Sequence, residues 1–217
     1  MSSDRIHQKG RGSFRSTDGW WARGYLPHFD EAGVFQFVTI RLADSLPRSV
    51  SETLLKQRAK RQGHFDNKSE QQKERYNRLE KLLDAGYGAC WLKREEVALI
   101  VVESLKFLVG QGHRVIRWVI MPNHLHLLIE LLPGSRLSAV IRSLKGYTGK
   151  AINAALGRRG PLWYPEFFDR YIRDEEHYNS VISYIDNNPV RAGLVQKHSE
   201  WRFSSAGWPE ALATKRP

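Results

Sequence analysis

A run of mostly apolar residues at 120–130 carries two histidines separated by a single leucine, and it constrains the fold more than any other stretch. Side chains alternate between the two faces of a β-strand, so His124 and His126 would share one face and Leu125 would point to the other. The nearly continuous apolar pattern after His126 favours a central strand covered on both faces. Two buried imidazoles need partners, which could be core carbonyl groups or a divalent metal. The spacing alone leaves both interpretations open.

The composition points to a polyanionic partner. The chain has 217 residues, 41% of them hydrophobic, and a formal net charge of +11. Such an excess of positive charge favours nucleic acid or a membrane surface, although solubility alone could also explain it. No apolar run is long enough to span a bilayer, and the polar N-terminus is not a secretory signal. The chain has a single cysteine, Cys90, so it cannot form an internal disulfide, which fits a reducing compartment. We therefore expect a cytoplasmic protein with no membrane partner.

The order of predicted elements indicates an α+β fold. Strands are expected at 34–42, 115–120, 124–132 and 167–172, and helices at 93–109, 137–156 and 174–188, where Pro189 should end the last helix. Without a basic helical insertion at about 51–84, this order gives a ferredoxin-like, RRM-like antiparallel sheet with helices on one face. The insertion could be a helical hairpin or a broken helix that projects a basic face from the core, or it could simply be a solvated charged helix. We expect a flexible basic arm at 1–19, one domain at 20–205 and a C-terminal tail at 206–217.

The last predicted helix offers two polar side chains that could meet the histidines. Tyr184 and Asn188 are four residues apart, so a helix places them one turn apart on the same face. Together with the two imidazoles they would form a metal site that keeps positions open for a substrate oxygen. A phenol with a pKa of about 10 is a poor nucleophile unaided, but it becomes useful against a phosphodiester polarised by a metal. A packing tyrosine and a helix-capping asparagine are the alternatives.

These motifs carry a family resemblance. Met121-Pro122-Asn123-His124-Leu125-His126, followed downstream by Tyr184-Ile185 and Asn188-Pro189-Val190-Arg191-Ala192-Gly193-Leu194-Val195, resembles the IS200-like single-tyrosine transposases, and most closely the REP-associated tyrosine transposases. The similarity extends over roughly 25–205 in the order of elements, with 51–84 as the least similar part. Either motif alone would be weak, but both in this order in a basic chain are specific. Trp163 is followed by Tyr164, where relatives commonly have glutamine.

The resemblance implies a fold, a chemistry and a set of roles. The fold would be that of the HUH endonucleases, with His124 and His126 as ligands of Mg²⁺ or Mn²⁺, Asn188 as a third polar ligand and Tyr184 as the nucleophile. The activity would be cleavage and rejoining of single-stranded DNA at palindromic REP-like hairpins through a 5′-phosphotyrosine. The setting would be the bacterial cytoplasm in association with the nucleoid, and a monomer is favoured over a homodimer.

Several basic residues are candidate phosphate contacts, since Lys and Arg supply most of the affinity for a nucleic-acid backbone. They are Arg142, Lys145, Lys150, Arg170, Arg173 and Arg191. Three other functions remain possible at this point: a catalytically inactive protein that binds repeat DNA, an RNA-recognition-type binding module with the same order of elements, and a metal-dependent hydrolase that uses water.

Overall fold

The computed structural model describes residues 33–47, 49–50, 70–108 and 113–207, together with three short strands between residues 14 and 29. The strands are β1 (Phe14–Arg15), β2 (Trp20–Ala22) and β3 (His28–Phe29), which pair as a small antiparallel sheet. Most of the predicted arm at 1–19 and of the tail at 206–217, and residues 51–69 of the predicted insertion, lie outside the described residues. The boundaries of the predicted domain therefore stay a prediction.

A four-stranded antiparallel sheet forms the centre of the fold. Its strands are β4 (Phe35–Arg41), β5 (His113–Ile120), β6 (His124–Leu131) and β7 (Phe168–Tyr171), in the spatial order β5-β6-β4-β7. The β-branched and aromatic residues of β4 suit a strand with both faces covered. A tight turn joins β5 to β6, closed by a bond from the backbone N–H of Met121 to the carbonyl of His124 at 2.9 Å. The predicted α+β fold with an antiparallel sheet is confirmed.

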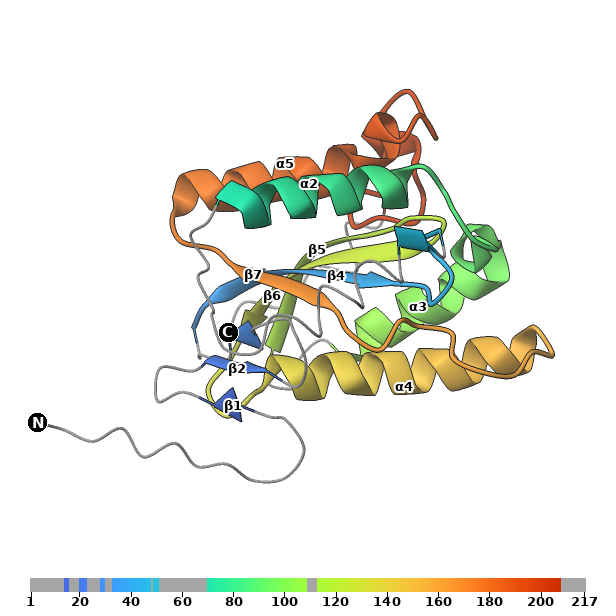
Figure 1. The fold of residues 1–217 in the computed structure, drawn as a ribbon, viewed down its shortest axis with the longest axis horizontal. Helices are drawn as coiled ribbons and strands as arrows, with labels where there is room; N and C mark the ends of the chain where they lie inside the picture. Colours follow the sequence, from blue (N-terminus) through green and yellow to red (C-terminus); the bar gives the residue numbers. More distant parts are fainter. Residues whose placement is uncertain are drawn as a thin grey trace, which may run out of the picture.

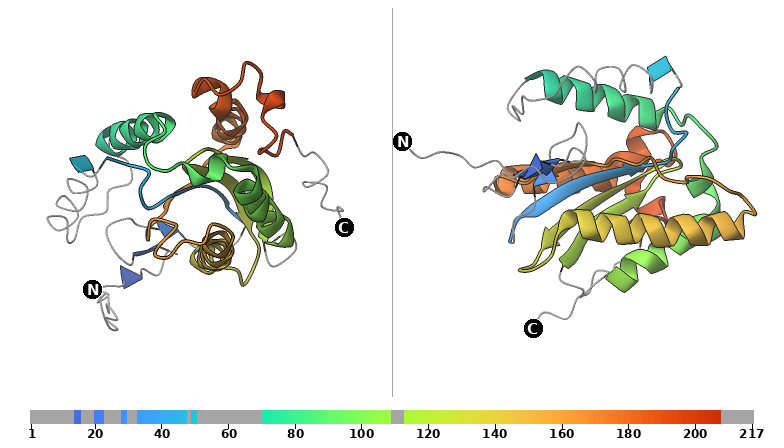
Figure 2. Two further views of the ribbon diagram at one scale, coloured as in Figure 1. Left: turned by 90° about the vertical axis from the view of Figure 1, so that its right-hand side faces the viewer. Right: turned by 60° about the horizontal axis from the view of Figure 1, so that its bottom comes forward.

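Among the described residues, four long helices pack on this sheet, and they cover both of its faces (Figure 1). They are α2 (Glu70–Asp84), α3 (Glu95–Leu108), α4 (Leu137–Ala155) and α5 (Glu175–Arg191), with short 3₁₀ turns at Trp91–Lys93 and His198–Glu200. Figure 2 shows α2 and α5 side by side on one face, and α3 and α4 on the other. The expectation that helices cover one face was wrong, because the apolar residues of β4 and β6 point to both faces and each set needs a cover.

The final helix continues past the proline that was expected to stop it. Helix α5 extends to Arg191 with Pro189 inside it. A proline in this position removes only one helical hydrogen bond, and the bond from the backbone N–H of Ala192 to the carbonyl of Asn188 is kept at 3.0 Å. Gly193, with φ of 68°, ends the helix in the left-handed conformation that glycine adopts most easily.

The apolar interior is divided between the two faces of the sheet. Leu125, Leu127 and Ile129 of β6 point to α3 and α4, where they join the larger core cluster around Trp118. Leu128 points to the opposite face, into a smaller cluster with residues of α5. His124 and His126 alternate with the leucines and therefore share the face of the smaller cluster. Among the described residues, no helix is long and apolar enough to cross a membrane.

Candidate active site

The two histidines lie on β6, on the face of the sheet that α2 and α5 cover. Their ring centroids are 4.7 Å apart, and both side chains are fully buried. His124 Nδ1 is 2.8 Å from Asn123 Oδ1, and His126 Nδ1 is 2.9 Å from Thr39 Oγ1 on the neighbouring strand β4. Within the described chain, neither Nε2 atom has a hydrogen-bond partner. Each imidazole is thus fixed through one nitrogen and leaves the other available, as is usual for histidines that bind a metal.

A carboxylate from a distant segment joins the histidines. Glu80 lies on α2 and is buried, with 3% of the residue exposed. Its Oε2 is 3.2 Å from His126 Nε2, without the alignment of a hydrogen bond, and its Oε1 has no hydrogen-bond partner in the described part of the chain. The ligand atoms of Glu80, His124 and His126 all lie within 4.8 Å of one another. These three residues can hold a metal ion.

Glu80 was not expected at the site, because residues 51–84 were predicted to form a helical insertion with a basic face. A signal was nevertheless present. Tyr76 lies four residues before Glu80 and Leu83 three residues after it, so the carboxylate falls on the apolar stripe of the helix. An acidic residue in such a stripe needs a buried partner.

The charges of the three residues suit a divalent cation. Burial raises the pKa of Glu80, but the neighbouring imidazoles of His126 and His124 outweigh that effect and lower its pKa to about 2. Burial, reinforced by His126, lowers the pKa of His124 to about 3 although Glu80 opposes the shift. At neutral pH the carboxylate is therefore charged and the His124 imidazole is neutral, which are the forms that bind metals. The donor set fits a divalent ion, since Glu80 Oε1, His124 Nε2 and His126 Nε2 are buried and have no hydrogen-bond partner in the described ranges.

Tyr184 of α5 meets this cluster. Its hydroxyl donates a hydrogen bond to Glu80 Oε2, and its ring centroid is 5.5 Å from that of His126. Burial and the negative charge of Glu80 raise the pKa of the Tyr184 phenol well above its usual value, so the resting side chain is neutral. The guanidinium of Arg191 lies 4.7 Å from the centre of the Tyr184 ring and partly opposes this shift. The side chain predicted as the nucleophile thus lies beside the residues that can bind a metal.

Asn188 is buried one helical turn beyond Tyr184. Its side chain is fully covered, and neither its amide nitrogen nor its amide oxygen has a hydrogen-bond partner among the residues that the structure describes. An unpaired buried amide costs about 1–3 kcal/mol, which contact with an ion or a substrate would offset. Its predicted role as a ligand stays a prediction.

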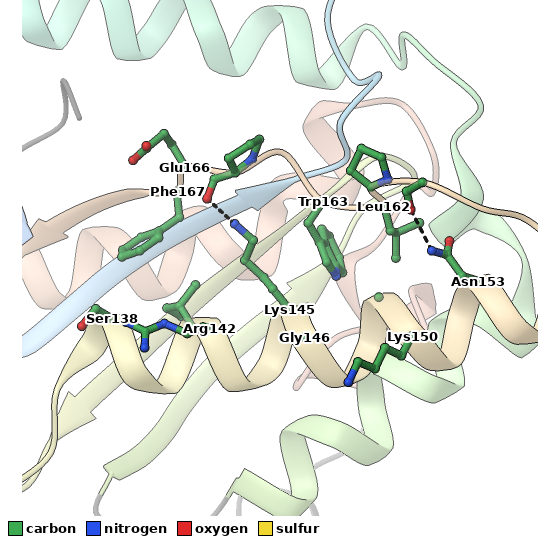
Figure 3. A pocket seen from close by; sticks show the side chains of 15 residues that line it. Ser138, Arg142, Lys145, Gly146, Lys150, Asn153, Leu162, Trp163, Glu166 and Phe167 are labelled. Atoms are coloured by element: carbon green, nitrogen blue, oxygen red, sulfur yellow. Dashed lines mark hydrogen bonds between the residues drawn. The ribbon is translucent and has the colours of Figure 1, made fainter. Parts of the chain in front are cut away.

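The six predicted phosphate contacts do not form one surface. Arg142, Lys145 and Lys150 line a groove of about 590 Å³ between α4 and residues 160–167, on the face of the sheet opposite the histidines (Figure 3). Arg170 and Arg173 lie at the end of β7, and Arg191 lies over Tyr184. The DNA contacts assigned to all six stay predictions.

Within the groove, Lys145 is held by its own surroundings. Its Nζ donates to the carbonyls of Tyr164 and Pro165 at 2.7 and 2.6 Å. Burial, reinforced by Arg41, lowers the pKa of Lys145 to about 8 against the opposing charge of Glu166. Lys145 therefore stabilises the loop at 160–167 whether or not it also contacts a ligand.

Comparisons with known proteins confirm the resemblance. Residues 94–188 match the family described as "Transposase IS200 like". The REP-associated tyrosine transposase of Escherichia coli (strain K12) is 34% identical over 89 residues, which are 41% of this chain and 51% of the relative. A putative REP-associated tyrosine transposase of Haemophilus influenzae (strain ATCC 51907 / DSM 11121 / KW20 / Rd) is 29% identical over 96 residues, 40% of this chain and 54% of the relative. The chain thus spans about half the length of the curated relatives it matches.

A solved structure agrees in fold. The REP-associated tyrosine transposase bound to a REP hairpin superposes with a TM-score of 0.50 at 21% identity, covering 88% of this chain and 86% of that one. The matched segment 94–188 contains both histidines, Tyr184 and Asn188, whereas Glu80 and the whole of α2 precede it.

Proposed function

We propose that this chain, which resembles the IS200-like transposases over residues 94–188, cleaves and rejoins single-stranded DNA with Tyr184 as nucleophile and a divalent metal at His124 and His126. One observation carries the proposal. The Tyr184 hydroxyl of α5 donates a hydrogen bond to the Glu80 carboxylate, and that carboxylate lies against the His126 imidazole of β6. A phenol needs an electrophile polarised by a nearby cation to attack a phosphodiester, and this arrangement supplies the place for one.

In the proposed reaction, the phosphate of one phosphodiester is transferred from a 3′-oxygen of the DNA to the phenolic oxygen of Tyr184. The phenolic oxygen of Tyr184 bonds to phosphorus while the bond from phosphorus to the 3′-oxygen breaks. The phenol loses its proton and the departing 3′-oxygen gains one, so the products are a 5′-phosphotyrosine and a free 3′-hydroxyl. A bound divalent cation supplies polarisation of the phosphate oxygens. Attack by a later 3′-hydroxyl reverses the step and rejoins the strand.

The residues around Tyr184 support these roles. The ring packs edge-on against Phe37 at 5.7 Å between centroids, which limits its rotation. The positive charge of Arg191 next to the ring would favour both the phenolate and an approaching phosphate. Asn188 lies one turn away, its amide has no hydrogen-bond partner in the part of the chain that the structure describes, and it is proposed as a further oxygen ligand. Imidazoles with carboxylate and amide oxygens suit Mn²⁺, and Mg²⁺ is compatible when waters complete its shell.

The proposed substrate is a palindromic hairpin of the REP type. The related transposase of known structure is bound to a REP hairpin. The net charge of +11 and the basic groove along α4 fit such a polyanion. The family resemblance of the sequence also leads us to propose a monomer that acts in the bacterial cytoplasm in association with the nucleoid. An RNA-recognition-type module would instead need exposed aromatic side chains on the sheet, and here helices cover both faces (Figure 1).

The test is formation of a covalent adduct. The protein is incubated with a labelled hairpin oligonucleotide and Mn²⁺, and the products are separated on a denaturing gel. Tyr184→Phe should abolish the adduct, whereas Tyr178→Phe, which removes a hydroxyl from a tyrosine on the same helix, should retain it. An adduct that survives in Tyr184→Phe rejects the assignment. A wild-type protein that binds the hairpin but forms no adduct would be an inactive repeat-DNA-binding protein, and cleavage without an adduct would indicate a hydrolase that uses water.

A further inference from the structure

Helix α2 reaches the site although it precedes the segment that matches the transposase family. The match begins at residue 94, whereas α2 covers Glu70–Asp84. Two side chains one turn apart on this helix, Tyr76 and Glu80, point to the histidine face of the sheet, where Figure 1 shows α2 lying beside α5. The contacts of these two side chains indicate what the helix does.

Glu80 touches both the proposed nucleophile and the proposed metal ligands with one carboxylate. Oε2 accepts the hydrogen bond of Tyr184 and lies 3.2 Å from His126 Nε2. Oε1 is buried and has no hydrogen-bond partner in the part of the chain that the structure describes. A buried carboxylate with one oxygen unpaired is costly unless a cation completes it. Oε1 and the two histidine Nε2 atoms, none of which has a hydrogen-bond partner among the described residues, together point to such a cation.

Tyr76 fixes the orientation of the helix that carries Glu80. Its ring stacks on Phe168 of β7 at 4.3 Å between centroids, and its hydroxyl lies 3.5 Å from Thr39 Oγ1. The same Thr39 hydroxyl is 2.9 Å from His126 Nδ1. Contacts at both ring nitrogens of His126 therefore lead back to α2. Nδ1 is hydrogen-bonded to Thr39, which lies against Tyr76, and Nε2 lies near Glu80 Oε2 without a hydrogen bond. Leu83, three residues after Glu80, is 1% exposed and anchors the next turn.

We propose that α2 is an integral part of the catalytic centre, in which Glu80 completes the metal site with His124 and His126 and positions the Tyr184 hydroxyl through the same carboxylate. Glu80 is thus a metal ligand and a positioning residue for the nucleophile. The positioning role rests on the proposed function above, whereas the role as a ligand does not depend on it. The centre is divided between the family-matched segment and a helix that lies outside it.

The ligand role is tested by metal binding without DNA. Mn²⁺ affinity is measured by the electron paramagnetic resonance signal of the free ion for the wild type, Glu80→Ala, Glu80→Gln and the control Glu74→Gln. Glu74 is an exposed carboxylate on the same helix, so its replacement removes one charge without touching the site. We expect Glu80→Ala to weaken binding by about tenfold or more, Glu80→Gln to weaken it less because an oxygen donor remains, and Glu74→Gln to bind like the wild type. Wild-type affinity in Glu80→Ala would overturn the ligand role.

The positioning role is tested by the kinetics of adduct formation at saturating Mn²⁺. We expect Glu80→Ala to lower kcat with little change in KM for the hairpin, because the phenol is misplaced while DNA binding is intact. Glu80→Gln should recover part of kcat, since its amide oxygen can still accept the hydrogen bond of Tyr184. A rate in Glu80→Ala equal to or above that of the wild type would overturn the positioning role and make the carboxylate an obstacle.

Two further measurements keep the outcomes distinct. Thermal unfolding followed by circular dichroism shows whether Glu80→Ala is folded, and Glu80→Gln, which preserves the shape of the side chain, carries the test if it is not. A wild type that forms no adduct, combined with Mn²⁺ binding that depends on Glu80, would reject the proposed function and keep the metal ligand. An active wild type whose Mn²⁺ binding and kcat are unaffected in Glu80→Gln and Glu80→Ala would reject the inference and keep the function.

Discussion

The two faces of the central sheet differ in what they bury, although the same strand contributes to both. On the face toward α3 and α4, β6 contributes Leu125 and Leu127 to a core in which most side chains are fully covered. On the face toward α2 and α5, it contributes His124 and His126, and the apolar cluster there is much smaller. Because side chains alternate along a β-strand, residues that stabilise the core and residues of the candidate site occupy adjacent positions of β6. Neighbouring substitutions on β6 should therefore have unrelated effects.

The largest expected effect on stability lies on the apolar face. Leu127→Ala should lower the free energy of unfolding by about 2–5 kcal/mol, because Leu127 is 1% exposed and its truncation leaves a cavity under α3 and α4. Urea denaturation measures the loss. The Mn²⁺ affinity of the folded variant should equal that of the wild type, and a large loss of affinity would show that the two faces are not independent.

Substitution of the adjacent residue, whose side chain lies on the other face, should affect metal binding more than stability. His126→Ala removes one proposed ligand, and we expect Mn²⁺ affinity to fall by about 100-fold or more, which corresponds to ~2.7 kcal/mol. Adduct formation should be lost with it. Without metal, this variant should be destabilised less than Leu127→Ala, since the His126 ring that it removes stacks on Phe37 of the smaller cluster. Unchanged Mn²⁺ affinity would contradict the placement of the metal.

A smaller effect is expected from the group that orients His126. Thr39→Val keeps the shape of the side chain but removes the oxygen that lies 2.9 Å from His126 Nδ1, and we expect about tenfold weaker Mn²⁺ binding. Thr148→Val is the matched control. Thr148 is also fully buried, but its hydroxyl bonds to Trp163 Nε1 and the carbonyl of Leu144 on the apolar face. It should lower stability and leave Mn²⁺ affinity unchanged, and equal losses of affinity in both variants would break the comparison.

The sequence predicted what local patterns encode. The alternation of side chains in 124–130 predicted that His124 and His126 share one face of a strand. The spacing of Tyr184 and Asn188 predicted that these two share one face of the last helix. It did not predict Glu80, which is 44 residues before His124 and meets it only through tertiary packing. In the sequence, Glu80 looks like the other charged residues of 51–84, which were expected to be solvated. No local pattern predicts which face of the sheet a helix will cover.

The placement of the helices on one face of the sheet was wrong for a related reason, although the apolar pattern after His126 had predicted a strand covered on both faces. Predicted strands whose residues are apolar at successive positions, such as Leu127 and Leu128, require a cover on both sides. The pattern therefore contained the need for a second layer, but it could not assign α2 and α5 to it. The extension of α5 beyond Pro189 depended on a balance between one lost hydrogen bond and the packing of the whole helix, which local rules do not weigh.

The smallest expected effect concerns the groove between α4 and residues 160–167 (Figure 3). Burial lowers the pKa of Lys145 to about 8, so its ammonium is charged at about pH 7 and mostly neutral by about pH 9.5. If Lys145 contacts a phosphate, Lys145→Met should reduce the salt dependence of hairpin binding by about one ion at the lower pH, and the difference from the wild type should vanish at the higher pH. Arg142→Gln is the control, since a guanidinium keeps its charge and its removal should lower the slope equally at both values. Equal slopes for Lys145→Met and the wild type at about pH 7 would show that Lys145 serves only the carbonyls of Tyr164 and Pro165.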